Sequence, residues 1–162
     1  MVVKSGASRR EAVMRIIPIS QQECSELLKR VSIGRLACSL DNQPYVVPVA
    51  FSYEPDCIYI FSTLGKKIKW MRQNPKVCLQ ADEIGNRSNW LSVIVTGTYL
   101  ELREPQYTAQ REHALEQLAE YSEWWRNPLA ERREQTRRCG PKLLSISRHA
   151  GDVRAAQFAG RG

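Results

Sequence analysis

Short apolar runs divided by turn residues dominate the first two thirds of the chain. Within each run, apolar side chains alternate with polar ones or follow one another directly, which is typical of β-strands buried on one face or on both. The sequences Asp41-Asn42-Gln43-Pro44 and Glu54-Pro55-Asp56 are short turns, so the strands beside them should pair in antiparallel order. The pattern predicts strands at residues 35–40, 45–53, 57–61, 77–81, 90–102 and 143–146.

Three segments have the spacing of helices instead. Ser20 and Glu23 form a capping-box sequence, and the apolar residues that follow recur at helical intervals toward Gly34, the expected end of the helix. Residues 65–73 predict a short helix that ends before the next proline, because proline disfavours a helical conformation in the residue preceding it. A third helix is expected after Pro105. The protein should therefore be mainly β with flanking helices.

The strand predicted around residues 45–51, Tyr-Val-Val-Pro-Val-Ala-Phe, is apolar at consecutive positions. Side chains alternate between the faces of a strand, so both faces should be covered, one by the core and the other by something else. Pro48 has no amide hydrogen to donate, which predicts an edge or a bulge at that position. Gly97, inside the longest strand, predicts a bulge or a close approach of the backbone.

Length and cysteine content narrow the class of protein. The 162 residues fit one domain with one core. The five cysteines include no Cys-x-x-Cys pair, and most lie in apolar segments, so we expect reduced thiols and a cytoplasmic protein. No segment approaches the roughly 20 apolar residues of a membrane span, and the basic, polar beginning of the chain does not resemble a signal peptide. We expect no association with membranes.

The net charge of +7 is concentrated at the two ends of the chain. Residues 1–15 carry +3 and residues 126–162 carry +6, which leaves −2 for residues 16–125. We interpret the basic ends as solubilising tails, with a polyanion site in residues 126–162 as the alternative. The C-terminal segment lacks the regularly spaced aromatic residues that would stack on bases, which argues against a nucleic-acid partner.

The densest chemical signal lies in Ser62-Thr63-Leu64-Gly65-Lys66-Lys67. Ser62 and Thr63 end a strand, whereas Lys66 and Lys67 fall in the first turn of a helix, where cations oppose the helix dipole. A bound anion would reverse that unfavourable interaction, and hydroxyl, ammonium and free amide groups together bind phosphate. The segment predicts a phosphate site, with a surface turn carrying two solvated lysines as the alternative.

Other chemistry has less support. His113 and His149 are the only histidines and neither lies near a cysteine pair, so we expect no metal site. No Gly-x-Ser-x-Gly sequence occurs, and no catalytic residue can be assigned. We interpret Trp124-Trp125 as partial core and interface, with a lid or a stacking platform as the alternative.

Seven short segments occur in an ordered series between residues 18 and 104. They are a helix with a Leu-Leu pair (27–28), Ile-Gly-Arg-Leu-Ala (33–37), Gln-Pro-Tyr-Val-Val-Pro-Val (43–49), Ile-Tyr-Ile-Phe-Ser-Thr (58–63), Gly-Lys-Lys-Ile (65–68), Asn-Pro-Lys-Val (74–77) and Ser-Val-Ile-Val-Thr-Gly-Thr (92–98). In this order and spacing the chain resembles the pyridoxamine-phosphate-oxidase-like FMN-binding split barrels, especially the small group that includes the 5-nitroimidazole reductases.

The resemblance implies a six-stranded antiparallel split β-barrel that forms a homodimer, with one FMN in each of two grooves between the subunits. We accordingly divide the chain into a polar basic leader (1–17), an FMN-binding core (18–104) and a C-terminal extension of the same domain (105–162). The residues implied at the cofactor are Val47, Pro48 and Val49 beside the isoalloxazine ring, Ser62, Thr63, Lys66 and Lys67 at the phosphate, and Trp90 and Ser92 facing the flavin from the same or the partner subunit.

Two departures limit what the resemblance implies. Ser62 stands where many nitroimidazole-reductase-like members carry histidine, so a role of that imidazole does not transfer. The C-terminal part lacks the Arg-x-His-type segment with which pyridoxamine-phosphate oxidases bind pyridoxal phosphate, so oxidation of that vitamin is not expected.

The expected function is an FMN-dependent oxidoreductase that takes electrons from a nicotinamide or another reductant. It would pass them to a small planar acceptor such as a quinone or a nitroaromatic, with the flavin itself performing the chemistry. The alternative is a protein that binds or senses a flavin, heme or a deazaflavin without turnover.

Overall fold

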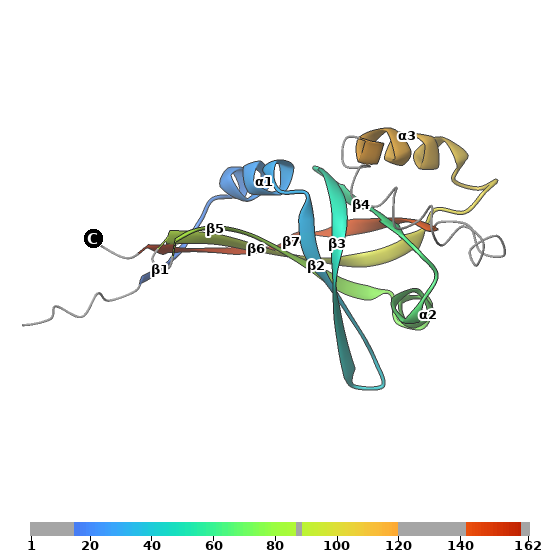
Figure 1. Ribbon diagram of the computed structural model, residues 1–162, viewed down its shortest axis with the longest axis horizontal. Coiled ribbons are helices and arrows are strands. Elements are labelled where there is room, and N and C mark those ends of the chain that lie inside the picture. Colours follow the sequence, from blue (N-terminus) through green and yellow to red (C-terminus); the bar gives the residue numbers. More distant parts are fainter. Residues whose placement is uncertain (1–14, 87–88, 120–141, 160–162) are drawn as a thin grey trace, which may run out of the picture.

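The structure, a computed structural model, describes residues 15–86, 89–119 and 142–159 (Figure 1). Its strands are β1 (Arg15–Pro18), β2 (Ile33–Leu40), β3 (Gln43–Glu54), β4 (Cys57–Ser62), β5 (Lys76–Asn86), β6 (Asn89–Glu101) and β7 (Lys142–Ala159). Its helices are α1 (Gln21–Arg30), α2 (Lys66–Gln73) and α3 (Thr108–Ala119). The six strands and three helices predicted above are all present, and the last strand is much longer than predicted.

Six of the strands form a closed antiparallel barrel. Neighbouring strands follow the order β4-β3-β2-β5-β6-β7, and β7 also pairs with β4, which closes the ring. The short β1, which the sequence pattern did not predict, pairs with the C-terminal end of β7. The expected six-stranded split barrel is thereby confirmed.

The predicted turns join neighbouring strands as two-residue hairpin loops. Asp41 and Asn42 connect β2 to β3 and have φ angles of 50° and 61°. Positive φ at both central positions matches the right-handed twist of the flanking strands, and the short polar side chains of Asp and Asn tolerate it. Pro55 and Asp56 connect β3 to β4. In Figure 1 the β2–β3 hairpin projects away from the other strands.

Helix α1 begins at the predicted capping box but ends earlier than predicted. The Glu23 amide donates to Ser20 Oγ at 3.2 Å, and the Ser20 amide donates to the Glu23 carboxylate at 2.7 Å. The helix ends at Arg30, so the expectation that Gly34 stops it is wrong. Gly34 lies within β2, where a Cβ atom would stand 2.9 Å from the carbonyl oxygen of Gln80 on β5. The glycine therefore permits close packing of two strands.

Both predicted irregularities coincide with changes in strand pairing. β3 pairs with β4 only from Phe51 to Glu54, so Pro48 lies where β2 is its only neighbour among the described strands. The register of β6 against β7 shifts between Val95 and Gly97. The predicted edge at Pro48 and the predicted bulge at Gly97 are confirmed.

The core lies mainly inside the barrel. The fully buried side chains there belong to both strands and helices, and they include Leu27, Leu28, Leu36, Phe51, Ile58, Ile60, Ile68, Met71 and Leu79. A smaller cluster on the outer face of β4 joins Tyr59 to Leu102, Ala114 and Leu118 beneath α3. In Figure 1, α1 and α3 lie on one side of the strands and α2 lies on the other, beside the β2–β3 hairpin. None of the described helices has the length and apolarity needed to cross a membrane.

The interpretation of residues 126–162 as a basic tail is wrong for residues 142–159. These residues form β7, whose backbone pairs with β4 along one edge and with β6 along the other. Leu144 and Ile146 of this strand are buried in the main core. Trp124-Trp125 and the outermost basic residues lie outside the described residues, so their interpretation stays a prediction.

We expect Gly34→Ala to lower the free energy of unfolding by about 1–3 kcal/mol, the usual cost of an extra carbon in a packed core. The new Cβ would also stand 3.0 Å from Leu79 Cδ1, so β2 and β5 would have to move apart. Denaturant unfolding measures the change. Gly65→Ala is the matched control, because its Cβ would meet nothing within 4 Å. Equal losses in the two variants would contradict this explanation of Gly34.

Candidate functional site

The barrel is split where β3 and β4 stop pairing. Their pairing starts at the hairpin loop, where Glu54 lies opposite Cys57, and ends where Phe51 lies opposite Ile60. From that point β4 continues beside β7 as far as Ser62, whereas the N-terminal half of β3 stays beside β2. The turn that follows β4 leads into α2, and Lys66 at the start of this helix contacts the ring of Tyr45 on β3. One edge of β3 and the β4–α2 turn therefore bound the split.

The β4–α2 turn contains the residues predicted to bind phosphate. Ser62 is buried, and its hydroxyl donates to the Thr63 carbonyl oxygen at 3.1 Å. Gly65 is the N-cap residue of α2, no side chain caps this helix, and its first turn contains no acidic residue. The first-turn amides thus have no side-chain cap, an arrangement that favours anions at helix N-termini.

The two lysines of the turn have different surroundings. The Lys66 ammonium lies 4.3 Å from the ring centroid of Trp70 and 5.1 Å from that of Tyr45. Lys67 is half-buried, and loss of hydration lowers its pKa, while the nearby Cys38 acts in the opposite direction. An anion beside Lys67 would compensate the ammonium for the hydration that burial removes.

The three residues predicted beside the flavin ring alternate between the two faces of β3. Val49 is buried and Val47 packs against the main core, so both side chains point inward. Pro48 is exposed on the outer face. No described strand pairs with this part of β3 on the side toward β4, so its backbone presents N–H and C=O groups along a strand edge. Backbone groups, more than side chains, can therefore contact a ligand here.

Trp90 and Ser92 do not meet the phosphate turn within one chain. Trp90 is 36% exposed on the outer face of β6, and the Ser92 hydroxyl accepts a hydrogen bond from the side-chain amide (Nε2) of Gln80 at 3.1 Å. Strand β7 separates β6 from β4, and strands β2 and β5 separate β6 from β3. The structure brings together the edge of β3 and the residues of the turn, but Trp90 and Ser92 belong to a different surface.

That surface is the outer face of β2, β5, β6 and the N-terminal half of β3. Paired residues of neighbouring strands share a face, and the registers assign to this one the exposed side chains Ile33, Val46, Ile84, Trp90 and Ile94. A groove of about 430 Å³ lies in the same face, between Pro44, Cys78 and Thr96. We call this face of the four strands the outer apolar face. It is the second apolar side expected for residues 45–51.

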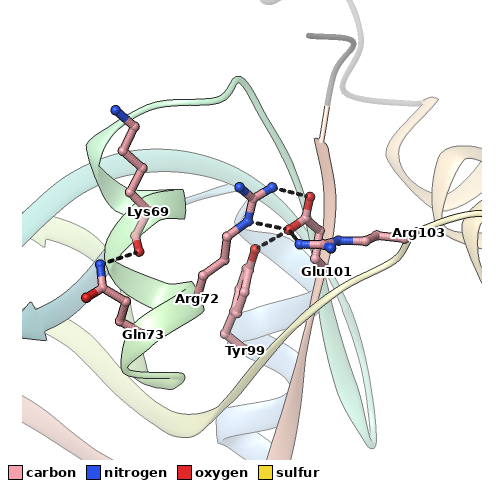
Figure 2. A network of polar contacts seen from close by, with 6 residues as sticks. All are labelled: Lys69, Arg72, Gln73, Tyr99, Glu101 and Arg103. Carbon is pink, nitrogen blue, oxygen red and sulfur yellow. Dashed lines mark hydrogen bonds and ion pairs between the residues drawn. The ribbon is translucent and has the colours of Figure 1, made fainter.

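An ion-pair network holds the C-terminal end of α2 (Figure 2). The Glu101 side chain is 5% exposed and accepts two hydrogen bonds from Arg72 and one from Arg103, each at 2.8 Å. The Tyr99 hydroxyl donates to the same carboxylate at 3.2 Å. Hydrogen bonds from Arg72 above all, with those from Arg103, lower the pKa of Glu101 to about 2. The network fixes the helix that begins with the phosphate turn. No sequence pattern predicted it, because its members lie up to 31 positions apart in the chain.

His113 connects α3 to the barrel. Its Nε2 atom lies 2.6 Å from Glu54 Oε1, and its ring meets the Tyr59 ring edge-on with centroids 5.8 Å apart. Both partners are at the end of the barrel that α3 covers. Among the residues that the structure describes, no group of three or more His, Cys, Asp or Glu residues could hold a metal ion.

Comparison with known proteins relates this architecture to a family. The sequence profile of the family named pyridoxamine 5'-phosphate oxidase matches residues 20–150. The chain belongs to this family. The match continues beyond residue 104, through α3 and into β7.

Individual members of the family and its fold were also found. An uncharacterised protein of Rhizobium meliloti (strain 1021) is 42% identical over 108 residues, which cover 66% of this chain and 72% of that protein. The crystal structure of an FAD-binding protein from Mesorhizobium loti is 35% identical, with a TM-score of 0.73, and the match covers 90% of this chain and 98% of that one. A candidate 5-nitroimidazole antibiotic resistance protein from Bacteroides thetaiotaomicron shares the fold, at 18% identity, a TM-score of 0.66 and coverage of 91% and 90%.

We expect Glu101→Gln to destabilise the protein at neutral pH and much less in acid. The pKa of Glu101 is lowered from 4.5 to about 2, so its contribution is complete above about pH 5 and disappears as the pH falls toward 2. The loss at pH 7 should be about 2 kcal/mol, less than the full shift would give, because both guanidinium groups are partly in water. Urea unfolding of both proteins at pH 7 and pH 3 measures it.

Glu83→Gln is the matched control. Glu83 pairs with Arg30 at the surface, where both side chains are about half exposed. Such pairs contribute about 1 kcal/mol or less, so this variant should lose little stability at either pH. A Glu101→Gln variant that loses no more than Glu83→Gln would contradict the assigned role of the network.

Proposed function

We propose that this chain binds a flavin through the FMN part of the cofactor, with the phosphate at the β4–α2 turn. The observation that carries the proposal is the position of this turn, since an uncapped helix N-terminus with two lysines lies beside a free edge of β3. Ser62, Thr63, Lys66 and Lys67 would supply hydroxyl and ammonium groups, and the first-turn amides would add N–H donors. Membership of the family and the flavin named for the Mesorhizobium loti protein support it.

The isoalloxazine ring would lie against the backbone of Val47, Pro48 and Val49. Exposed N–H and C=O groups at a strand edge offer both donors and acceptors to the polar edge of such a ring. The inward side chains of Val47 and Val49 would hold the strand in position through the core.

We further propose that two chains form a homodimer through the outer apolar face, with a flavin in each groove between the subunits. Exposed apolar side chains gather on four adjacent strands, and contiguous exposed apolar patches mark sites of protein–protein contact. In such a dimer Trp90 and Ser92 would face the partner's flavin, because whole strands separate them from the turn of their own chain.

The chemistry would be an oxidation–reduction, in which the bound flavin supplies the electron transfer. The residues of this chain would bind the phosphate, orient the ring and limit the access of water. A nicotinamide is the proposed donor, and a small planar quinone or nitroaromatic is the proposed acceptor.

A visible absorption spectrum of the purified protein, followed by anaerobic mixing with NADH or NADPH and then with an acceptor, tests these steps in order. A flavin that is bound but neither reduced nor reoxidised would favour a binding or sensing role. A protein that takes up no flavin would contradict the proposal.

We expect the double variant Lys66→Ala, Lys67→Ala to bind FMN roughly 100-fold more weakly than the wild type, with little change in riboflavin binding. Hydrogen bonds to charged groups contribute about 1.5 kcal/mol or more each. Riboflavin has no phosphate, so it makes no such bonds to the lysines and cannot lose them. Titration calorimetry with both ligands measures the two affinities. Lys69→Ala, which removes an exposed charge from the same helix, is the control and should leave both affinities nearly unchanged. Equal affinity of the wild type for FMN and riboflavin would refute the phosphate assignment.

We expect the wild type to sediment as a dimer at low micromolar concentration, because a stable interface of this kind buries about 2,000 Å² or more. The double variant Val46→Asp, Ile94→Asp introduces like charges into the outer apolar face, and it should sediment as a monomer with weakened flavin binding. Leu115→Asp, at an exposed apolar position on α3, is the control and should remain dimeric. A wild-type monomer that retains flavin would exclude a site shared between subunits.

A further inference from the structure

A second pocket lies at the C-terminal end of α2, away from the phosphate turn. It has a volume of about 340 Å³ and lies between the end of this helix and the residues that lead from β6 to α3. Arg72, which lines the pocket, follows Lys66 by six residues, a separation of about 9 Å along the helix axis at a rise of about 1.5 Å per residue. The flavin proposed above lies at the other end of α2, so the proposed function does not use this pocket.

The lining of the pocket is partly apolar and partly charged. Its apolar part consists of Met71, Pro75 and Leu100. Its charged part consists of Arg72, Arg103 and Glu101, whose formal charges sum to +1. Figure 2 shows the two guanidinium groups approaching the Glu101 carboxylate from different elements of the fold. The pocket therefore combines an apolar wall with an excess of positive charge.

The arginines of the pocket have more hydrogen-bond donors than Glu101 uses. Arg72 binds Glu101 through Nε and Nη2, and Arg103 binds it through Nη2. Each guanidinium has five N–H donors, so each keeps donors for another acceptor. The carboxylate already accepts these three hydrogen bonds and a fourth from Tyr99. The acceptor that fits the pocket is therefore an anionic group brought by a ligand.

We propose that this pocket binds a small carboxylate with an apolar body, such as an aromatic acid. The carboxylate would lie between Arg72 and Arg103, because the planar N–H pairs of a guanidinium match its two oxygens. The Tyr107 hydroxyl lines the pocket and accepts a hydrogen bond from the Gln106 side chain at 3.2 Å, so its own hydrogen would be donated to the ligand. The apolar body would pack against the wall that contains Leu100.

A purely structural explanation of the same groups makes a different prediction. Arg72 lies in the last turn of α2, where the helix dipole favours a cation, and Arg103 helps to neutralise Glu101. If these are their only roles, water fills the pocket. The protein would then attract anions through its net charge of +7, without preference for this position. The place where an acid binds, and its need for the carboxylate, separate the two explanations.

The first measurement titrates the isotopically labelled wild-type protein with benzoate at low salt and follows the titration by NMR. Arginine Nε–H groups give signals of their own, and we expect those of Arg72 and Arg103 to shift together with the amide signals of residues 100–107 and to saturate with one affinity. Benzamide has nearly the same shape but no charge, so it should bind at least about tenfold more weakly. Equal binding of the two probes, or shifts spread over the basic surface without saturation, would overturn the proposal.

The second measurement repeats the benzoate titration on variants of Arg103. Arg103→Gln removes one guanidinium and should weaken binding at least about tenfold. Arg103→Lys retains a charge that can pair with Glu101 but lacks the planar pair of donors, so its loss should be smaller. Arg30→Gln is the matched control, because it removes a half-exposed guanidinium that pairs with Glu83, and it should bind benzoate like the wild type. The NMR spectrum also reports whether each variant is folded.

The double variant Lys66→Ala, Lys67→Ala separates this pocket from the proposed flavin site. It should bind benzoate like the wild type, because the phosphate turn lies at the other end of α2. Loss of benzoate binding in this variant would assign the probe to the phosphate turn and overturn the proposal. Unchanged affinity in Arg103→Gln, or in Arg103→Lys if the glutamine variant does not fold, would also overturn it. A protein that binds benzoate here but takes up no flavin would contradict only the proposed function.

Discussion

Backbone pairing between β3 and β4 extends from the hairpin loop only as far as the pair Phe51 and Ile60. The candidate site depends on the separation of the two strands beyond that pair. A strand edge inside a barrel would ordinarily be satisfied by its neighbour, because unpaired N–H and C=O groups are costly when buried. Here β4 continues with β7 and β3 continues with β2, so the strands that bound the split are each supported on the other side. The edge of β3 can therefore stay open without loosening the barrel.

Strands β2, β3, β5 and β6 separate the buried core from the outer apolar face. Inward side chains such as Leu36 and Val49 form the core, and outward ones such as Ile33 and Val46 form the outer apolar face. One residue of a strand therefore belongs to the core and the next to the outer apolar face, which is a direct result of the two-residue period of a β-strand. A shift of one residue in register would exchange the two sets.

Local patterns predicted most of the fold. The capping box at Ser20, the turn at Asp41-Asn42 and the edge at Pro48 depend on residues close together in the sequence, and each was predicted correctly. The role of Gly34 and the length of β7 depend on strands far away in the sequence. No local rule shows that β5 passes within 3 Å of the position of a missing side chain at Gly34.

The candidate site was also predicted from local patterns only in part. The Ser62–Lys67 segment carries hydroxyls, a glycine and two lysines in a row, so the sequence alone indicates an anion site. The Glu101 network joins side chains 29 positions apart, and the pairing of Tyr45 with Trp70 requires β3 and α2 to meet. Both contacts join residues that are distant in the sequence, so no local pattern predicts them.

The closure of the barrel by β7 has a consequence for how the protein is made. Ser62 pairs with Lys142, 80 residues later in the chain, and β6 finds its second neighbour only in the same late strand. During synthesis, β4 and β6 therefore leave the ribosome with open edges, and the barrel cannot close until β7 follows. Contacts between such distant segments slow folding, and open edges can pair with other chains in the meantime. The nascent chain thus passes through a period in which protection from aggregation depends on how fast its last strand arrives.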